Sequence, residues 1–213
     1  GKSHFLKILS YLLENKEVGG KKAIDYFVDD NKISDQMVLA DMKLAGTIPT
    51  DVVLFNIDSK SEVNGKQSKV AIVSVLQNVF NEMQGFSGAN PFLADLERKL
   101  TEEEKYDLFK EKFEDSFGSA WEESRSDFDF IQDDVVEVLD EIGFMSIEAG
   151  RNWCEKATGE YTYKVEDFAR LVKKYLDKKE SNHHIVFLID EIGQYIGCLL
   201  YTSDAADDRI SVD

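Results

Sequence analysis

The chain of 213 residues has little of what marks secreted, fibrous or membrane-spanning proteins. It contains only two Pro and two Cys, which excludes a collagen-like sequence and a disulfide-rich secreted scaffold. The longest uninterrupted apolar run covers residues 185–189, far too short to cross a bilayer. Because 43% of the residues are apolar, the chain is long enough to bury a core. We therefore expect a globular protein of the reducing cytoplasm, with no membrane contact.

Basic residues are also scarce. The chain has 25 Lys and Arg against 42 Asp and Glu, a net charge of -17, so a broad electrostatic grip on nucleic-acid phosphates is excluded. Contact with DNA is expected to be indirect, and a direct contact would need a local basic patch or another part of the protein. Residues 101–145 alone hold 16 acidic and 4 basic residues. We interpret this stretch as solvated helix faces, with docking of a basic partner or mimicry of DNA as the alternatives.

Both ends of the sequence suggest a fragment. The chain begins with Gly1-Lys2-Ser3 in place of Met, so we expect it to start inside a motif. Residues 198–213 look like the translation of a transposase-type sequencing adapter and are expected to be non-native, the alternative being a natural acidic tail. Without them 38 acidic residues, 24 basic residues and one Cys remain, so the acidity does not depend on this tail.

Periodicity predicts the secondary structure. Residues 50–58 and 185–191 contain nearly continuous apolar runs rich in β-branched residues, which predict two parallel core strands buried on both faces. An i, i+3, i+4 apolar pattern predicts a first helix over residues 2–15. Two short helices are expected next, the second beginning at a Ser34 cap and ending at Gly46. Further helices are predicted over residues 70–80, 91–100, 102–117, 133–142 and 165–176.

The first candidate site is the opening tripeptide. Gly1-Lys2-Ser3 matches the end of G-x-x-x-x-G-K-[ST], in which backbone amides cradle phosphates, Lys meets the β and γ oxygens, and the hydroxyl binds Mg²⁺. The first five positions of this motif are missing, and the tripeptide alone is a weak signal. We interpret Gly1, Lys2 and Ser3 as nucleotide-binding residues, with Ser3 also a Mg²⁺ ligand.

The second candidate site strengthens the first. Asp190 and Glu191 close the second predicted strand, and carboxylates in this position lie at the mouth of a parallel sheet. Asp190 is then a Mg²⁺ ligand and Glu191 the catalytic residue that orients or deprotonates the attacking water. The alternative for Asp190 is a helix N-cap. Together the two motifs predict an ATP and Mg²⁺ site with hydrolytic activity.

Other reactive side chains have structural interpretations. His183 and His184 have no partners at ligand spacing and are expected at the entry of a strand, and Cys154 is expected to be buried and inert. His4 is expected either near the phosphates or in solvent. Aromatic residues recur at helical spacing along the acidic stretch and are expected in the core. They are Tyr106, Phe109, Phe113, Phe117 and Trp121.

Three segments together resemble a known family. Residues 1–9, 51–58 and 184–197 are similar to the large P-loop ATPase of BREX bacteriophage-resistance systems, the BrxC/PglY family, and the most specific part is Asp-Glu-Ile-Gly-Gln-Tyr-Ile-Gly at residues 190–197. The resemblance implies a cytoplasmic, AAA-like ATPase that acts with other defence proteins such as a DNA methyltransferase, with a homo-oligomer possible. The family's proteins are far longer than this chain.

The predicted fold class is α/β, a partial P-loop NTPase core of three layers with a large acidic all-helical insertion. The predicted domains are residues 1–61 and 183–197 for the core, 62–182 for the insertion, and 198–213 for the adapter-like tail. With most of the phosphate loop missing, this chain is expected to bind ATP poorly or not at all. Two alternatives remain: another AAA-type DNA-processing ATPase, such as a replication initiator or helicase loader, and an acidic helical interaction module with nucleotide only as a switch.

Overall fold

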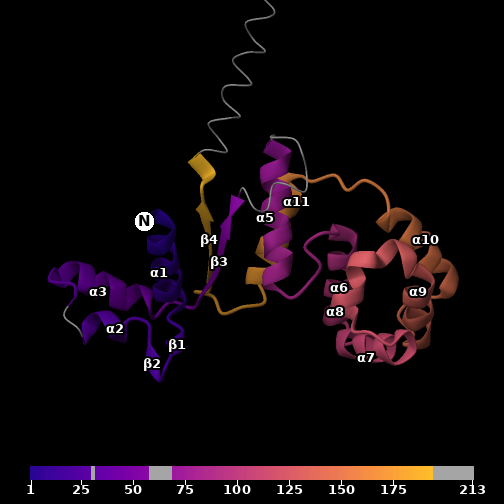
Figure 1. Ribbon diagram of the computed structural model, residues 1–213, viewed down its shortest axis with the longest axis horizontal. Helices are drawn as coiled ribbons and strands as arrows, with labels where there is room; N and C mark the ends of the chain where they lie inside the picture. The colour runs from indigo at the N-terminus through magenta and orange to yellow at the C-terminus, as the bar shows by residue number, and fades with distance from the viewer. Residues whose placement is uncertain (30–31, 58–68, 194–213) are drawn as a thin grey trace, which may run out of the picture. The chain divides into compact units, whose positions relative to one another are not determined.

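The computed structural model describes residues 1–29, 32–57 and 69–193 and divides the chain into two compact units (Figure 1). The first unit, called here the sheet unit, comprises Gly1–Val75 and the residues from Tyr163 onward. The second, the helical unit, comprises Leu76–Thr162, and the boundary falls within α5 (Lys69–Met83). The fold is of the mixed α/β class. The adapter-like residues 198–213 lie outside the described residues.

Two parallel strands form the centre of the sheet unit. β3 (Thr50–Asn56) pairs with β4 (His184–Asp190) in a register that runs from Thr50 opposite His184 to Asn56 opposite Asp190. This confirms both predicted strands and their parallel pairing. The expected burial on both faces is wrong, because most residues of both strands are only half-buried and Leu54 is 39% exposed. In the described sheet each strand has one partner and one open edge, which leaves its side chains partly accessible.

Helices contact this sheet on two sides. α1 (Lys2–Glu14), the first predicted helix, packs against both strands. α11 (Val165–Leu176) is also as predicted and contacts the face of the sheet that carries Asp51 and Phe187. The rings of Phe168 and Phe187 meet edge to face, 6.1 Å apart. In Figure 1, α1 and α11 lie on opposite sides of the two strands. The carboxyl end of β4 is thereby brought beside the start of α1.

The segment between α1 and β3 holds a hairpin that the sequence pattern did not predict. β1 (Glu17–Val18) and β2 (Lys21–Lys22) pair antiparallel. Gly19 and Gly20 make the turn between them with φ of 61° and 81°, a region that residues with a side chain rarely adopt. The short helix α2 (Asp25–Val28) follows the hairpin, as expected.

The start of α3 (Gln36–Ala45) corrects a predicted cap. The N-cap is Asp35 and not Ser34, because the Asp35 carboxylate accepts hydrogen bonds from the amides of Met37 and Val38, at 2.8 and 3.2 Å. These are the second and third helical positions, which a carboxylate at the N-cap reaches. The helix ends at Gly46, as predicted.

The helical unit is built from short helices around one apolar core. They are α6 (Pro91–Glu102), α7 (Tyr106–Phe117), α8 (Trp121–Ser124), the 3₁₀ helix η1 (Arg125–Phe130), α9 (Gln132–Glu141) and α10 (Ile147–Ala157). The predicted helix over residues 102–117 starts too early. α6 continues to Glu102, and Glu104, with φ of 57°, interrupts the helical backbone before α7. α10 was not predicted. Its apolar residues are interrupted by Gly150 and Arg151, which weakens the periodic signal.

The aromatic stripe packs into this core as expected. Phe109, Phe113 and Trp121 are fully buried, and the Trp121 ring meets the two phenylalanine rings edge to face at 5.1 and 5.2 Å. Tyr106 is half-buried against this core, and the expectation is wrong for Phe117, which lies at the end of α7 and is 38% exposed. Cys154 is buried, as predicted, and burial together with the charge of Asp133 raises the pKa of its thiol to about 11. A thiol with this pKa stays protonated at neutral pH, as an inert residue does.

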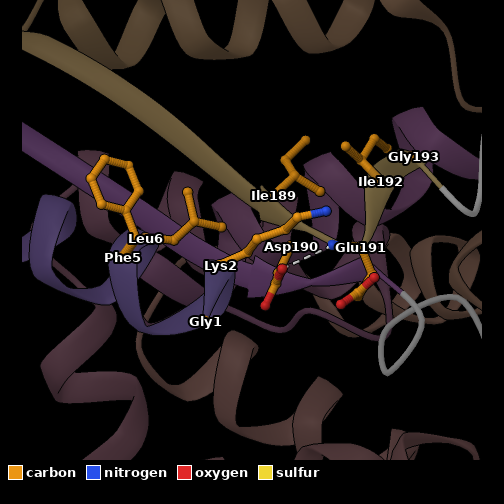
Figure 2. A pocket seen from close by; sticks show the side chains of 9 residues that line it. All are labelled: Gly1, Lys2, Phe5, Leu6, Ile189, Asp190, Glu191, Ile192 and Gly193. Carbon is orange, nitrogen blue, oxygen red and sulfur yellow. Dashed lines mark hydrogen bonds between the residues drawn. The ribbon is translucent and has the colours of Figure 1, made fainter.

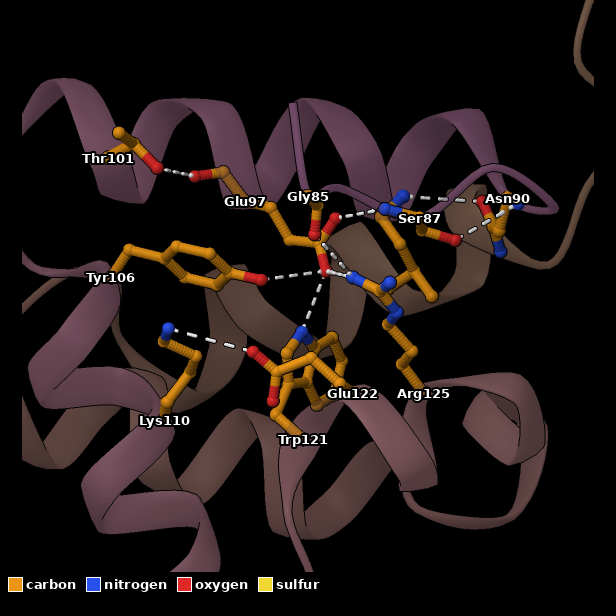
Figure 3. Close-up of polar contacts among 11 residues, drawn as sticks. Gly85, Ser87, Asn90, Glu97, Thr101, Tyr106, Lys110, Trp121, Glu122 and Arg125 are labelled. Carbon is orange, nitrogen blue, oxygen red and sulfur yellow. Dashed lines mark hydrogen bonds and ion pairs between the residues drawn. The ribbon is translucent and has the colours of Figure 1, made fainter. Parts of the chain in front are cut away.

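One fully buried carboxylate connects several parts of the helical unit (Figure 3). Glu97 Oε1 accepts from Trp121 Nε1 and Arg125 Nη1, both at 2.7 Å, and from the Tyr106 hydroxyl at 3.1 Å. Its Oε2 accepts from the Ser87 amide at 2.5 Å. Burial and the charge of Glu97 raise the pKa of Tyr106 far above its usual value. Glu97 thus joins α6, α7, α8, η1 and the loop before α6 through charge-assisted hydrogen bonds.

Within the residues that the structure describes, no helix combines the length and the apolar character that crossing a membrane requires.

Candidate functional site

The start of α1 supplies the first part of the candidate site. Gly1 is the N-cap, and its carbonyl accepts a hydrogen bond from the Phe5 amide at 3.2 Å. No side chain caps this helix end, and its first turn holds no acidic residue. The amides of a first helical turn and the positive end of the helix dipole favour anions. Lys2, exposed in the same turn, adds a positive side chain.

The carboxyl end of β4 supplies the second part. Asp190 is the last residue of the strand, and its Oδ1 accepts a hydrogen bond from the Glu191 amide at 3.1 Å. Glu191 has φ of 61°, in the left-handed region that costs a residue with a side chain roughly 1 kcal/mol or more. This turn carries the chain away from the strand immediately after Asp190.

These two parts line one pocket of about 720 Å³ (Figure 2). Figure 2 shows the Lys2 side chain reaching from α1 toward the turn that holds Asp190 and Glu191. Apolar side chains make up the rest of the lining together with two glycines. The complete lining is Gly1, Lys2, Phe5, Leu6, Ile189, Asp190, Glu191, Ile192 and Gly193. Residues from the two ends of the described chain therefore share one cavity, as the two sequence motifs require.

The remaining residue of the opening tripeptide lies differently. Ser3 is exposed on the first turn of α1 and is not among the residues that line the pocket. His4 is also exposed and outside the lining, which agrees with the solvent position considered for it. The role of Ser3 as a Mg²⁺ ligand stays a prediction.

Comparison with known proteins does not identify this site. No family model matches the chain, and no solved structure gives a significant match.

The charges of the lining suit an anion that is paired with a cation better than a bare anion. Lys2 and the helix end attract phosphate, while Asp190 and Glu191 repel it unless a cation lies between them. Mg²⁺ is usually held by one or two carboxylates together with substrate phosphates. In the part of the chain described, no group of three or more His, Cys, Asp or Glu side chains could hold a metal by itself. The cavity volume lies within the usual range for small-molecule sites, about 300–1,000 Å³.

A second polar cluster lies at the opposite end of the strands and was missed in the sequence. Asp51 Oδ2, near the start of β3, accepts from the Tyr175 hydroxyl at 2.6 Å and lies 2.7 Å from His183 Nε2. Lys179 Nζ is 4.0 Å from the same oxygen. Burial raises the pKa of Asp51, but the hydrogen bonds from Tyr175 and His183 and the charges of His183 and Lys179 outweigh it, so the net shift is downward.

The physical role of this cluster is to join α11 to the sheet. Tyr175 lies in α11, and its pKa is raised, first by burial and then by its hydrogen bond to Asp51. His183 precedes β4, so its expected place at the strand entry is confirmed, but its partner could not be inferred. A polar residue near the start of a strand gives no sign of which distant side chain it contacts.

Proposed function

We propose that the pocket between α1 and β4 is part of an ATP-binding and ATP-hydrolysing site of the P-loop type. The observation that carries this proposal is the shared cavity. In it Lys2 and the Asp190–Glu191 pair, which are far apart in sequence, face one another. A helix N-terminus beside a lysine suits phosphate, and two carboxylates at a strand end suit Mg²⁺. Neither feature alone would justify the proposal.

Each residue has a defined role in this proposal. The Lys2 ammonium offsets the charge of the phosphate oxygens, and Gly1 keeps the helix end open for close approach. Asp190 would hold Mg²⁺, and Ser3, which does not line the pocket, is the residue whose hydroxyl would bind the same ion. Glu191 orients the attacking water and accepts its proton. Bound Mg²⁺ supplies the positive charge that stabilises charge developing on the phosphoryl oxygens.

The wider biological role follows from the resemblance of the three sequence segments. We propose a cytoplasmic AAA-like ATPase of a BREX bacteriophage-resistance system, acting with a DNA methyltransferase and other defence proteins and contacting DNA only indirectly. Its energy source is ATP hydrolysis. The test measures phage protection by the coding sequence from which the chain derives. Glu191→Gln is expected to abolish this protection. If the Glu191→Gln variant protects fully, ATP hydrolysis is excluded as the source of protection.

A second function is favoured by the charge of the helical unit. Leu76–Thr162 contains 22 acidic and 8 basic residues, so nearly all of the net charge belongs to this unit. In this alternative the helical unit docks a basic partner and nucleotide only switches the interaction. Salt-sensitive binding of a partner that persists in Lys2→Ala and Glu191→Gln would support it.

Nucleotide binding itself is tested with Mg-ATP and a matched pair of lysine variants. Of the two outcomes expected from the truncated phosphate loop, weak binding or none, the pocket favours weak binding, because one lysine and one helix end face two carboxylates. We expect millimolar affinity, on the order of -4 kcal/mol, which ligand-observed saturation-transfer NMR detects. Lys2→Ala should weaken binding at least tenfold. Lys7→Ala is the control, because Lys7 is an exposed lysine of the same helix that does not line the pocket.

Two outcomes would contradict the proposal. One is the absence of Mg-ATP binding to the folded wild-type chain at ~10 mM, well above the expected dissociation constant. The other is an equal loss of affinity in Lys2→Ala and Lys7→Ala, which would indicate a general charge effect in place of a site.

A further inference from the structure

The residues that line the pocket include one aromatic side chain, that of Phe5. Phe5 is 63% exposed although it is a large apolar side chain, and it lines the pocket. It follows Lys2 by three positions on α1, and residues three apart lie on the same face of a helix. The ring is therefore held on the face from which Lys2 reaches toward Glu191.

The lining of the pocket has two chemically different parts. Lys2, Asp190 and Glu191 form the polar part. The apolar part consists of Phe5, Leu6, Ile189 and Ile192. In Figure 2 the Phe5 ring lies at the end of the group away from Glu191. A ligand made only of phosphate would leave this apolar part in contact with water, whereas a ligand with a planar ring would cover it.

We propose that Phe5 is the platform on which the base of the bound nucleotide stacks. This inference rests on the proposed nucleotide site and goes further by naming the ligand class: a nucleoside phosphate, and not inorganic polyphosphate. Phosphates occupy the polar part between Lys2 and the two carboxylates, and the base covers the Phe5 ring. Phe5 is a positioning residue that makes no contact with the reacting atoms.

The chemistry of the platform also predicts its selectivity. Stacking on an aromatic face tolerates any base, because every base has a π-face. The other apolar side chains of the lining, Leu6, Ile189 and Ile192, offer no hydrogen bonds that would distinguish adenine from guanine. ATP and GTP should therefore bind with similar affinity, and the smaller ring of UTP should bind more weakly.

The experiment compares Mg-ATP, Mg-UTP and magnesium tripolyphosphate on the wild-type chain, Phe5→Ala, Phe5→Leu and Tyr11→Ala. Affinities for nucleotides come from saturation transfer to the base protons, and that for tripolyphosphate from ³¹P line widths. Tyr11 is a matched control, since it is 43% exposed on the same helix and outside the pocket. Retained helical circular dichroism verifies that each variant is folded.

The expected results separate stacking from general apolar contact. Phe5→Ala should weaken Mg-ATP binding about tenfold and leave tripolyphosphate binding unchanged. Phe5→Leu should recover only a small part of the loss, because leucine keeps apolar area but has no planar face. Saturation transfer to the base protons should fall in both variants, and Tyr11→Ala should behave as wild type.

The outcomes distinguish this inference from the function on which it rests. If tripolyphosphate and ATP bind the wild-type chain equally tightly, and Phe5→Ala changes neither, the phosphate site stands and the base platform is wrong. If Phe5→Leu binds ATP as well as wild type does, stacking is wrong. If neither ligand binds the folded wild-type chain, both the platform and the proposed function are overturned.

Discussion

His183 Nε2 lies 2.7 Å from Asp51 Oδ2, so the residue that precedes β4 is joined to the second residue of the strand beside it. The same carboxylate accepts the Tyr175 hydroxyl from α11. Three segments of the sheet unit therefore meet at one aspartate, at the end of the strands opposite the candidate site. This contact stabilises the scaffold on which Asp190 and Glu191 are placed.

The first prediction concerns pH. The pKa of Asp51 is lowered in the folded chain, so its contribution to stability is present above its unfolded pKa, about 3.9, and is lost as the pH falls through the lower folded value. Asp51→Asn should therefore destabilise the sheet unit at pH 7 and destabilise it less at about pH 2, because the stability that the wild-type carboxylate contributes falls as this group is protonated. Urea unfolding followed by the NMR signals of β3 and β4 measures the difference.

The control for this prediction is Asp41→Asn. Asp41 is an exposed aspartate of α3 in the same unit, and its replacement should change stability little at either pH. If Asp51→Asn destabilises the sheet unit equally at pH 7 and at pH 2, the charge of the carboxylate contributes nothing to the stability of this unit.

The second prediction concerns Glu97. Glu97→Ala removes the acceptor of the buried Trp121 Nε1 and the ion-pair partner of Arg125, whose Nη1 keeps its hydrogen bond to the Gly85 carbonyl, so the helical unit should lose about 3 kcal/mol or more. Both tryptophans of the chain, Trp121 and Trp153, belong to this unit, so tryptophan fluorescence reports its unfolding alone.

Glu122→Ala is the matched control for Glu97. Its ion pair with Lys110 spans 3.6 Å at the surface and should contribute at most ~1 kcal/mol. If the two alanine variants lose similar stability, the buried carboxylate does not organise this core.

The third prediction concerns the contact of α9 and α10. A Cβ on Gly150 would lie 3.0 and 3.1 Å from the two methyl carbons of Val136, which is closer than ordinary contact. Gly150→Ala should therefore lower stability by roughly 1–2 kcal/mol through crowding, despite the better helix propensity of alanine. In a Val136→Ala background the space is free, and the same change should be neutral or stabilising. Additive effects in this double-mutant cycle would exclude the crowding.

Local sequence patterns predicted the regular parts of the fold. The continuous apolar runs correctly predicted β3 and β4, and the i, i+3, i+4 spacing correctly predicted α1, α6 and α11. The predicted helix boundaries were less accurate where a single residue sets the boundary, as Asp35 does at the start of α3 and Glu104 does between α6 and α7. The contacts of Glu97 and Asp51 could not be predicted, because each joins residues far apart in sequence whose types are compatible with many other partners.

The candidate site was predictable to a different degree. Lys2 and Glu191 were chosen from two short motifs, and their common pocket depends on the packing of α1 beside β4, which no motif encodes. The role proposed for Phe5 could not be predicted from the sequence, because an apolar residue at that spacing is expected in a core and only the structure reveals its exposure.

The most direct test of the central claim maps where Mg-ATP binds on the isotope-labelled chain by two-dimensional amide NMR. The account predicts shifts that saturate together at Leu6, Ile189 and Gly193 and that disappear in Lys2→Ala, with amides of Leu76–Thr162 unchanged. Shifts confined to the helical unit, or shifts around the pocket that persist unchanged in Lys2→Ala, would contradict it.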